Sequence, residues 1–495
     1  MQNPKLKNLH DTWLEEATIA DLQGKMAEGS LTSKELVLMY LYRISQLDRK
    51  GPELKSVLEI NPDAIQIAAA LDAERELKGP RGPLHGIPVL LKDNIDTGDN
   101  MHTSAGSKAL ADSYALKDSE VARRLREAGA VILGKTNMTE WANFMAIGMK
   151  SGYSSRGGQT LNPYGPERFD VGGSSSGSGA AIAANFAAVA VGTETSGSIL
   201  DPSAQNALVG IKPTVGLISR RGIIPIAHTQ DTAGPMARTV KDAAILLTVL
   251  SGEDPEDPAT LASRLPGFDF TVFLEKGLSG KRLGFAREHY VEQAGENRAA
   301  VVEKAIDKLK ELGAEIVEIS IPSAKKQWDW EVLTFEFKTG LNAYLKGLGP
   351  AAKIRSLADV IQFNTENEAE MLKYGQEVLI GSEATSGGLY EEAYVHSLEF
   401  NEYHAKENGI DFVLAEHNLD AIVFPHTEGA DISARAGYPS VVVPAGYTEE
   451  GEPVGITFAG TAWSEPDLIQ LAYAFEQETF YRKAPDFGKI TTGLE

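Results

Sequence analysis

The chain has 495 residues and a formal net charge of −22, from 47 lysines and arginines against 69 aspartates and glutamates. Its 42% hydrophobic and 23% charged residues exclude the disordered and collagen-like classes. The acidic charge, with no basic cluster to offset it, argues against nucleic-acid and membrane partners, and the absence of cysteine excludes disulfides, thiolate metal sites and a cysteine nucleophile.

The N-terminal region has no continuous apolar run of the kind that forms the core of a signal peptide. Nowhere does the chain offer the roughly 18 apolar residues that a membrane span requires. We therefore predict a cytoplasmic protein. The mature form of a secreted protein, with its signal peptide removed, would give the same pattern.

The first predicted elements are helices, followed by two strands. Thr32 and Glu35 have the spacing of a capping box before a helical pattern of apolar residues. The short apolar run 86–92 then predicts a buried strand that ends at Lys92. A helix that stops at Gly129 leads into a second buried strand at 130–133.

Two polar turns are predicted around a buried element. Residues 172–179 are only glycine and serine, 180–190 are almost all small and apolar, and 193–198 form a second polar turn. The pair Asp201-Pro202 offers an N-cap and a first-turn proline. We therefore expect a helix to begin close behind Ser198.

The second half of the chain predicts a βαβ unit and two further strands. Residues 281–286 and 314–319 are strand-like and enclose a helix that Gly313 ends. Residues 421–424 and 440–443 are two more short apolar runs between turn residues. The sheet should therefore draw strands from both halves.

The acidic stretch 252–258, which contains two prolines, is the one tempting domain boundary. Strand and helix signals alternate on both sides of it, so we predict one large α/β domain over residues 1–495. Within it, residues up to about 80 and the region 324–404 are predicted to be mainly helical.

Two catalytic motifs match in their letters but not in their context. Residues 129–136 fit the P-loop pattern G-x-x-x-x-G-K-[ST], but the variable positions Ala-Val-Ile-Leu predict a strand instead of a flexible turn. Residues 173–177 fit the nucleophile elbow G-x-S-x-G, but the polar, proline-rich residues 162–170 cannot supply the strand that must precede it. We predict neither nucleotide binding nor an α/β-hydrolase site. The nine histidines show no HExxH pattern, so no metal site is predicted.

A lysine at the end of a buried strand can act as a general base if burial keeps it neutral. Lowering its pKa from ~10.4 to ~7 or 8 requires ~3 to 5 kcal/mol, which a dry strand end can supply. Lys92 has this position, and a neutral lysine could activate a serine hydroxyl. The alternative is a structural ion pair between Lys92 and the adjacent Asp93.

Several segments together resemble the amidase signature family. The resemblance is carried by Gly-Gly-Ser-Ser-Ser-Gly-Ser-Gly at 172–179 and by Gly-Thr-Glu-Thr-Ser-Gly-Ser-Ile at 192–199. Further segments that are similar to the family lie at 84–95, 134–141, 209–214, 231–236 and 437–446. The resemblance runs over nearly the whole chain and is weakest over 324–404. It implies a central mixed, twisted β-sheet covered by helices on both faces.

The resemblance also implies roles for individual residues. Ser198 would be the nucleophile, Lys92 the base, and Ser174, after a cis peptide bond, the serine that passes the proton between them. The backbone near Ala142 and Asn143 would border the substrate pocket. No metal or cofactor would take part. Four backbone N–H groups would bind the oxyanion: those of Thr195, Ser196, Gly197 and Ser198.

Three positions depart from the commonest family pattern: Ser196 stands where glycine is usual, Leu200 where arginine is usual, and Asp201 follows it. None of these changes deletes a proton-transfer group. The Thr-Glu-Thr wording and the triple serine are most similar to peptide amidases, which remove the nitrogen from C-terminal peptide amides.

We therefore predict an enzyme that converts a carboxamide to a carboxylate and ammonia through a Ser198 acyl-enzyme. Its substrate would be a small-molecule or peptide amide, with no obligate protein partner. Three alternatives stay open: the glutaminase subunit of a tRNA-dependent amidotransferase, a general aliphatic or aryl amidase, and a catalytically silent binding protein on this fold.

Overall fold

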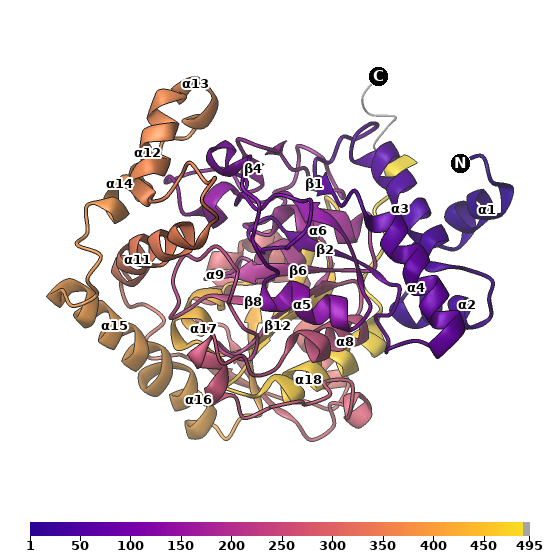
Figure 1. Ribbon diagram of the computed structural model, residues 1–495. Helices are drawn as coiled ribbons and strands as arrows, with labels where there is room; N and C mark the ends of the chain where they lie inside the picture. The colour runs from indigo at the N-terminus through magenta and orange to yellow at the C-terminus, as the bar shows by residue number, and fades with distance from the viewer. Residues whose placement is uncertain (489–495) are drawn as a thin grey trace.

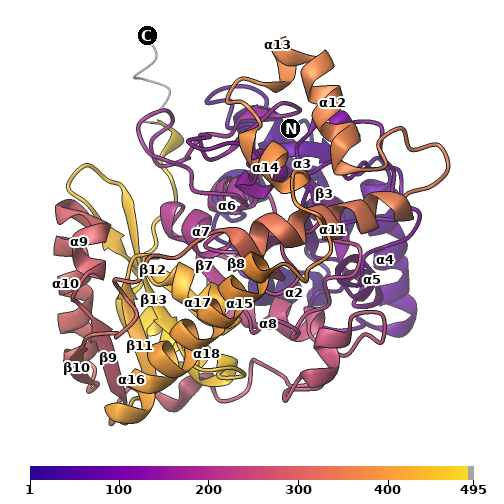
Figure 2. The same ribbon diagram turned by 90° about the vertical axis from the view of Figure 1, so that its left-hand side faces the viewer.

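One mixed β-sheet runs through the whole molecule, as Figure 1 and Figure 2 show. The computed structural model describes residues 1–488. The sheet consists of β1 (Val57–Ile60), β2 (Pro88–Lys92), β3 (Val131–Thr136), β6 (Val189–Glu194), β7 (Val209–Lys212), β8 (Thr232–Ala237), β9 (Arg282–Ala286), β10 (Glu315–Ile319), β11 (Ala421–Pro425), β12 (Ser440–Tyr447) and β13 (Pro453–Ala459). A separate small hairpin is formed by β4 (Tyr153–Ser154) and β5 (Gly158–Gln159).

The order of the strands divides the sheet into an N-terminal and a C-terminal half. The eleven strands follow the order β1-β3-β2-β6-β8-β7-β12-β13-β11-β9-β10. The two halves meet where β7 pairs antiparallel with β12, with Gly210 opposite Val442. The pairs β2/β3, β2/β6, β9/β10 and β9/β11 are parallel and the others antiparallel, so the sheet is mixed as predicted.

Helices cover both faces of this sheet. Val441 and Val443 of β12 lie in the main hydrophobic core, whereas Val442 between them packs against Leu200 and Ala204 on the opposite face. This alternation follows from the two-residue period of a strand that is buried on both sides. The α-helices are α1 (Pro4–Thr12), α2 (Ile19–Ala27), α3 (Ser33–Leu47), α4 (Ala64–Lys78), α5 (Glu120–Glu127), α6 (Ser176–Ala183), α7 (Leu200–Gln205), α8 (Val240–Leu250), α9 (Tyr290–Ala294), α10 (Glu296–Glu311), α11 (Glu331–Gly347), α12 (Leu357–Glu366), α13 (Glu368–Met371), α14 (Glu377–Glu383), α15 (Glu392–Ala405), α16 (Asp411–Glu416), α17 (Ala430–Ala436) and α18 (Glu465–Thr479).

Most of the elements predicted from local patterns are confirmed. Thr32 and Glu35 form the capping box of α3. The strand before Lys92 is β2, and the P-loop-like residues 129–136 contain β3 instead of a flexible turn. The βαβ unit is β9, α10 and β10, with the two strands parallel.

Two predictions about the glycine- and serine-rich region are wrong. Residues 172–179 are not a loop throughout, because α6 begins at Ser176. Its glycines allow close packing: a Cβ on Gly177 would lie 2.3 Å from the Ser56 carbonyl oxygen. Asp201 is not an N-cap, since α7 already begins at Leu200 and Asp201 lies inside its first turn.

The helical region predicted between 324 and 404 contains α11 to α15, which form the left side of the view in Figure 1. It contacts the N-terminal half of the sheet: the Tyr344 hydroxyl on α11 donates to the Asp96 carboxylate at 2.8 Å. On the same helix, the Glu336 carboxylate accepts the Thr229 N–H at 3.0 Å. Across the described residues 1–488, every helix is too short or too polar to span a membrane.

Candidate active site

Lys92 lies where two parallel strands end side by side. β2 and β6 are parallel neighbours, so Lys92 at the end of β2 reaches the end of β6. Its side chain is fully buried, and Nζ donates to the Ser174 hydroxyl at 2.8 Å and to the Thr193 carbonyl at 3.1 Å. The ion pair with Asp93 is therefore not formed. The Asp93 carboxylate instead accepts from the Ser104 hydroxyl and from the Gly106 N–H.

Burial makes Lys92 suitable for proton transfer. Removal of the amine from water lowers the pKa of Lys92 to about 7, against the opposing influence of Glu194 and Asp231. An ordinary lysine is almost wholly protonated at neutral pH, whereas this one is neutral in a large fraction of molecules. The structure thus places a neutral amine in direct contact with a serine hydroxyl.

The two predicted catalytic serines each precede a helix. Ser174 lies just before α6, after the cis peptide bond expected at Gly173, and Ser198 lies just before α7. The loops touch directly, because the Ser175 N–H donates to the Ser198 carbonyl at 3.2 Å. The Ser198 hydroxyl has no hydrogen-bond partner among the described residues. The structure therefore contains the Lys92–Ser174 contact but no hydrogen bond between the two hydroxyls.

Carboxylates on two sides hold the turn before Ser198. The Thr195 hydroxyl donates to Asp231 at 2.6 Å, and the Ser196 hydroxyl donates to Asp431 on α17. The positive φ of this turn falls on Gly197, at 79°, and not on Ser196. Serine in place of the usual glycine at 196 is therefore accommodated without backbone strain.

A third carboxylate lies beneath the turn. Glu194 Oε2 accepts the N–H groups of Ile199 and Leu200 at 2.8 and 3.0 Å, and so caps the start of α7. Burial raises the pKa of Glu194, against the lowering influence of Lys212 and of the backbone amides. Across the part of the chain that the structure describes, the N–H groups of Thr195 and Ser198 have no hydrogen-bond partner.

Sequence analysis did not identify Glu194, Asp231 or Asp431 as residues that hold the site. The signal that could have found the first two is their place inside quoted family segments, Thr-Glu-Thr and the segment 231–236. Asp431 had no such signal, because it meets Ser196 from 235 residues away in the chain.

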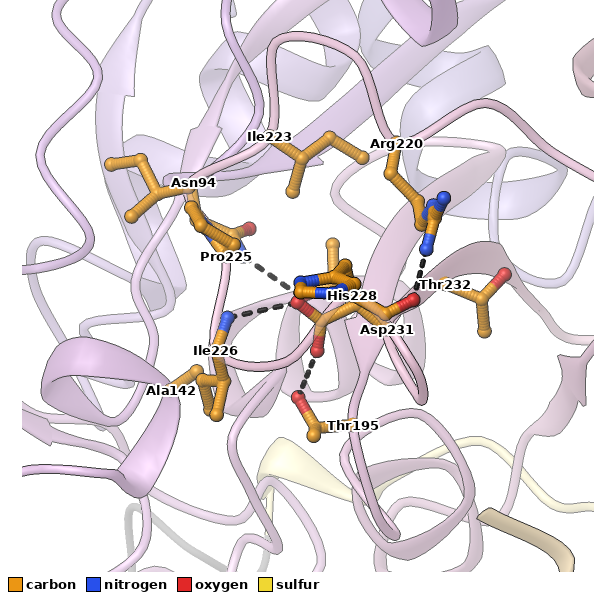
Figure 3. A pocket seen from close by; sticks show the side chains of 12 residues that line it. Asn94, Ala142, Thr195, Arg220, Ile223, Pro225, Ile226, His228, Asp231 and Thr232 are labelled. Carbon is orange, nitrogen blue, oxygen red and sulfur yellow. Dashed lines mark hydrogen bonds between the residues drawn. The ribbon is translucent and has the colours of Figure 1, made fainter. Parts of the chain in front are cut away.

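A small pocket lies beside this turn, and Figure 3 shows the side chains of Asp231 and Thr195 directed toward one another within it. Ala142 lines the pocket, as predicted for the substrate side. Asn143 is exposed and is not part of the lining. Trp141, Ala142 and Asn143 all have positive φ, at 52°, 54° and 66°. Consecutive left-handed residues without glycine are costly, and such strain is typical of functional sites.

A family model described as Amidase matches residues 35–435, the greater part of the chain. The chain belongs to the amidase signature family. This amidase is 46% identical to the native peptide amidase from Stenotrophomonas maltophilia, whose structure it matches with a TM-score of 0.90 over 96% of this chain and 99% of that one. It is 44% identical to a probable amidase of Arabidopsis thaliana, over 96% of this chain and 92% of the relative.

The amidase is more distantly similar to one component of a tRNA-dependent enzyme. It is 33% identical to the A-type subunit of the glutamyl-tRNA(Gln) amidotransferase of Alkaliphilus metalliredigens, over 94% of this chain and 97% of that protein. Family and fold together make this protein a hydrolase that acts on C–N amide bonds.

Proposed function

We propose that this amidase converts a primary carboxamide to a carboxylate and ammonia through a relay of Lys92, Ser174 and Ser198. The observation that carries the proposal is the 2.8 Å hydrogen bond from Lys92 to the Ser174 hydroxyl, in a buried setting where the pKa of Lys92 is about 7. A histidine is not needed, because the lysine itself supplies a neutral base.

The first half of the reaction forms an acyl-enzyme. Neutral Lys92 takes the proton of Ser174, and Ser174 takes the proton of Ser198 as Ser198 Oγ attacks the carboxamide carbon. The tetrahedral intermediate then collapses: the C–N bond breaks, and the proton held by Lys92 returns through Ser174 to the leaving nitrogen. Ammonia departs and the acyl group stays on Ser198.

The second half repeats the relay with water. Water replaces the leaving nitrogen, the relay removes its proton, and its oxygen attacks the acyl carbon. The ester bond to Ser198 breaks, Ser198 Oγ regains a proton, and the carboxylate product leaves. Lys92 is neutral again at the end, so no net proton change occurs on the relay.

Backbone N–H groups of the turn 195–198 would stabilise the oxyanion of both intermediates. Supporting this role, the N–H groups of Thr195 and Ser198 have no partner among the described residues, and the turn is anchored by Asp231, Glu194 and Asp431. A fixed donor of this kind contributes ~2.7 to 4 kcal/mol in other acyl-transfer enzymes.

We further propose peptides with a C-terminal carboxamide as the substrates. The 46% identity to a peptide amidase supports this class. The left-handed backbone at Ala142 and Asn143, beside the pocket, would border the leaving nitrogen and leave room for ammonia only. A continuing peptide chain would then be excluded by sterics, so internal peptide bonds should survive.

The relay is tested with the Ser198→Ala variant and an activated phosphonate. Ser198→Ala should lose turnover and covalent labelling together, measured as ammonia release and as intact mass. Wild-type protein that takes up no phosphonate and releases no ammonia from any amide would favour a silent binding protein instead.

The substrate class is tested with one peptide prepared both as the amide and as the free acid. Mass spectrometry should show conversion of the amide to the acid and no internal cleavage of either. Cleavage inside the free acid would exclude the assignment. Activity restricted to small aryl or aliphatic amides would make the protein a general amidase.

A second candidate is the glutaminase subunit of a tRNA-dependent amidotransferase, which the 33% identity to the A-type subunit supports. The isolated chain separates the two functions. Release of ammonia from peptide amides without added protein supports the peptide amidase and the expected absence of an obligate partner. Activity on glutamine alone, and only with partner subunits, supports the amidotransferase. A cytoplasmic location stays a prediction.

A further inference from the structure

Asp201 contacts both serine-bearing loops at once. It lies in the first turn of α7, three residues after Ser198. Its backbone N–H donates to the Gly197 carbonyl at 2.8 Å, and its carboxylate accepts the Gly173 N–H at 2.9 Å. A single residue therefore links the position before Ser198 to the position before Ser174.

The two loops also approach each other backbone to backbone at this point. A Cβ added to Gly172 would lie 2.6 Å from the Pro202 Cα and 3.0 Å from the Asp201 carbonyl carbon. Contact thus fixes how closely the loops approach. The hydrogen bond from Gly173 to Asp201 then fixes how one loop is oriented against the other.

Asp201 lies among other charged groups. Burial raises the pKa of Asp201 to about 7; the Gly173 amide and Arg298 on α10 oppose this shift, while Asp170 and Glu428 add to it. Both protonation states can still accept the Gly173 N–H, because a carboxylic acid keeps its carbonyl oxygen. The link between the loops therefore persists when Asp201 changes its charge.

We propose that Asp201 is a positioning residue that holds Ser174 and Ser198 at proton-transfer distance. The proposal rests on the relay proposed above, in which Ser174 accepts the proton of Ser198. Misplacement of a reacting group by about 1 Å can cost roughly 100-fold in rate. Asp201 is assigned no contact with substrate, so its loss should lower kcat and leave KM nearly unchanged.

The test compares three substitutions at Asp201 with one at a neighbouring carboxylate. Asp201→Ala removes the acceptor, Asp201→Asn keeps a carbonyl oxygen in its place, and Asp201→Glu keeps the charge but moves the acceptor by one methylene. The matched control is Asp170→Ala. Asp170 accepts the Gly172 N–H at 2.7 Å on the same loop, but it makes no contact with the turn that carries Ser198.

We expect Asp201→Ala and Asp201→Glu to lower kcat by about 10- to 100-fold with KM within about threefold, and to slow phosphonate labelling of Ser198 by a similar factor. Asp201→Asn should recover kcat to within a few-fold of wild type. Asp170→Ala should lose much less. Melting temperatures and circular dichroism identify any variant that has not folded, and Asp201→Glu against Asp201→Asn decides the matter if Asp201→Ala does not fold.

The proposal is overturned if Asp201→Glu keeps wild-type kcat, if Asp201→Asn is no better than Asp201→Glu, or if Asp170→Ala loses as much as they do. Failure of the relay itself gives a different result. In that case Ser198→Ala or Lys92→Met stays active, whatever the Asp201 variants do.

Discussion

Two fully buried lysines lie on neighbouring strands of this amidase, and they have different surroundings. Lys135 on β3 donates to three oxygens, the carbonyls of Ile95 and His102 and the Thr103 hydroxyl, at 2.7, 3.1 and 3.0 Å. Lys92 on β2 donates to one carbonyl and to the Ser174 hydroxyl. Burial lowers the pKa of both lysines.

The difference lies in the number of acceptors and in the carboxylates nearby. Four acidic groups oppose the lowering of the Lys135 pKa: Asp93, Asp96, Asp99 and Glu59. Only Glu194 and Asp231 do so at Lys92. Saturated hydrogen bonding favours a charged, structural lysine, whereas a sparse environment leaves Lys92 able to exchange its proton. Burial alone would not have separated the two.

The largest expected effect is on catalysis at Lys92. Lys92→Met should lower kcat by about 10² to 10⁴-fold at neutral pH, because the relay loses its base. Lys135→Met, the matched change on the next strand, should retain far more activity per folded molecule. Steady-state ammonia release on both purified variants measures this, and equal losses would break the distinction between a catalytic and a structural lysine.

The next effect is on stability at Lys135. Lys135→Met should lower the free energy of unfolding by about 3 to 5 kcal/mol, since it leaves buried carboxylates and carbonyls without their cation. Urea denaturation at neutral pH is the measurement. An unchanged unfolding midpoint would mean that Lys135 does not anchor the loop between residues 93 and 103.

Lys92→Met should do the reverse and stabilise the fold by about 1 to 3 kcal/mol near pH 6 to 7, the cost of burying the amine less two lost hydrogen bonds. The pKa of Lys92 is about 7 in the folded protein and 10.5 as its ordinary value. Between these values the unfolded chain binds more protons, so wild-type stability rises with pH and the gap to Lys92→Met closes toward pH 10.5. A gap that widens with pH would contradict this account.

The same value predicts the acid limb of the activity profile. The neutral form of Lys92 is the active one, so kcat/KM should be constant well above pH 7 and fall about tenfold per pH unit below it. Initial rates from pH 5 to 9, with controls for unfolding at each end, measure the midpoint. A midpoint near 10 would place the base in its ordinary protonated state and exclude it from the relay.

The smallest expected effect is none at all. Residues 129–136 match a P-loop in letters only, and Lys135 already donates to protein oxygens. Calorimetric titration with a magnesium nucleotide should therefore give no binding heat. A micromolar affinity that Lys135→Ala removes would revive the nucleotide-binding hypothesis.

Local patterns and the family resemblance predicted much of this protein. The spacing of apolar residues gave the strand that ends at Lys92, and the quoted motifs placed Ser174 and Ser198 in turns that the structure brings together. The structure confirms the turns and the cis peptide bond, while the catalytic roles stay a proposal.

Long-range contacts escaped prediction for a physical reason. Asp231 reaches Thr195 across 36 residues, and Asp431 reaches Ser196 across 235. No periodicity links positions so far apart, because only the strand order of the whole sheet sets their distance. The N-cap assigned to Asp201 was wrong for a similar reason: Glu194, from the preceding strand, caps α7 instead.

The pairing of β7 with β12 limits how this protein could be divided. Lys92, Ser174 and Ser198 all lie on the N-terminal side of 252–258, so a fragment ending there would carry the whole proposed relay. Without β12, however, its sheet would end at β7 with a row of unpaired backbone groups, which is a template for aggregation. The C-terminal strands thus act toward the catalytic half as a built-in chaperone that shields its open edge.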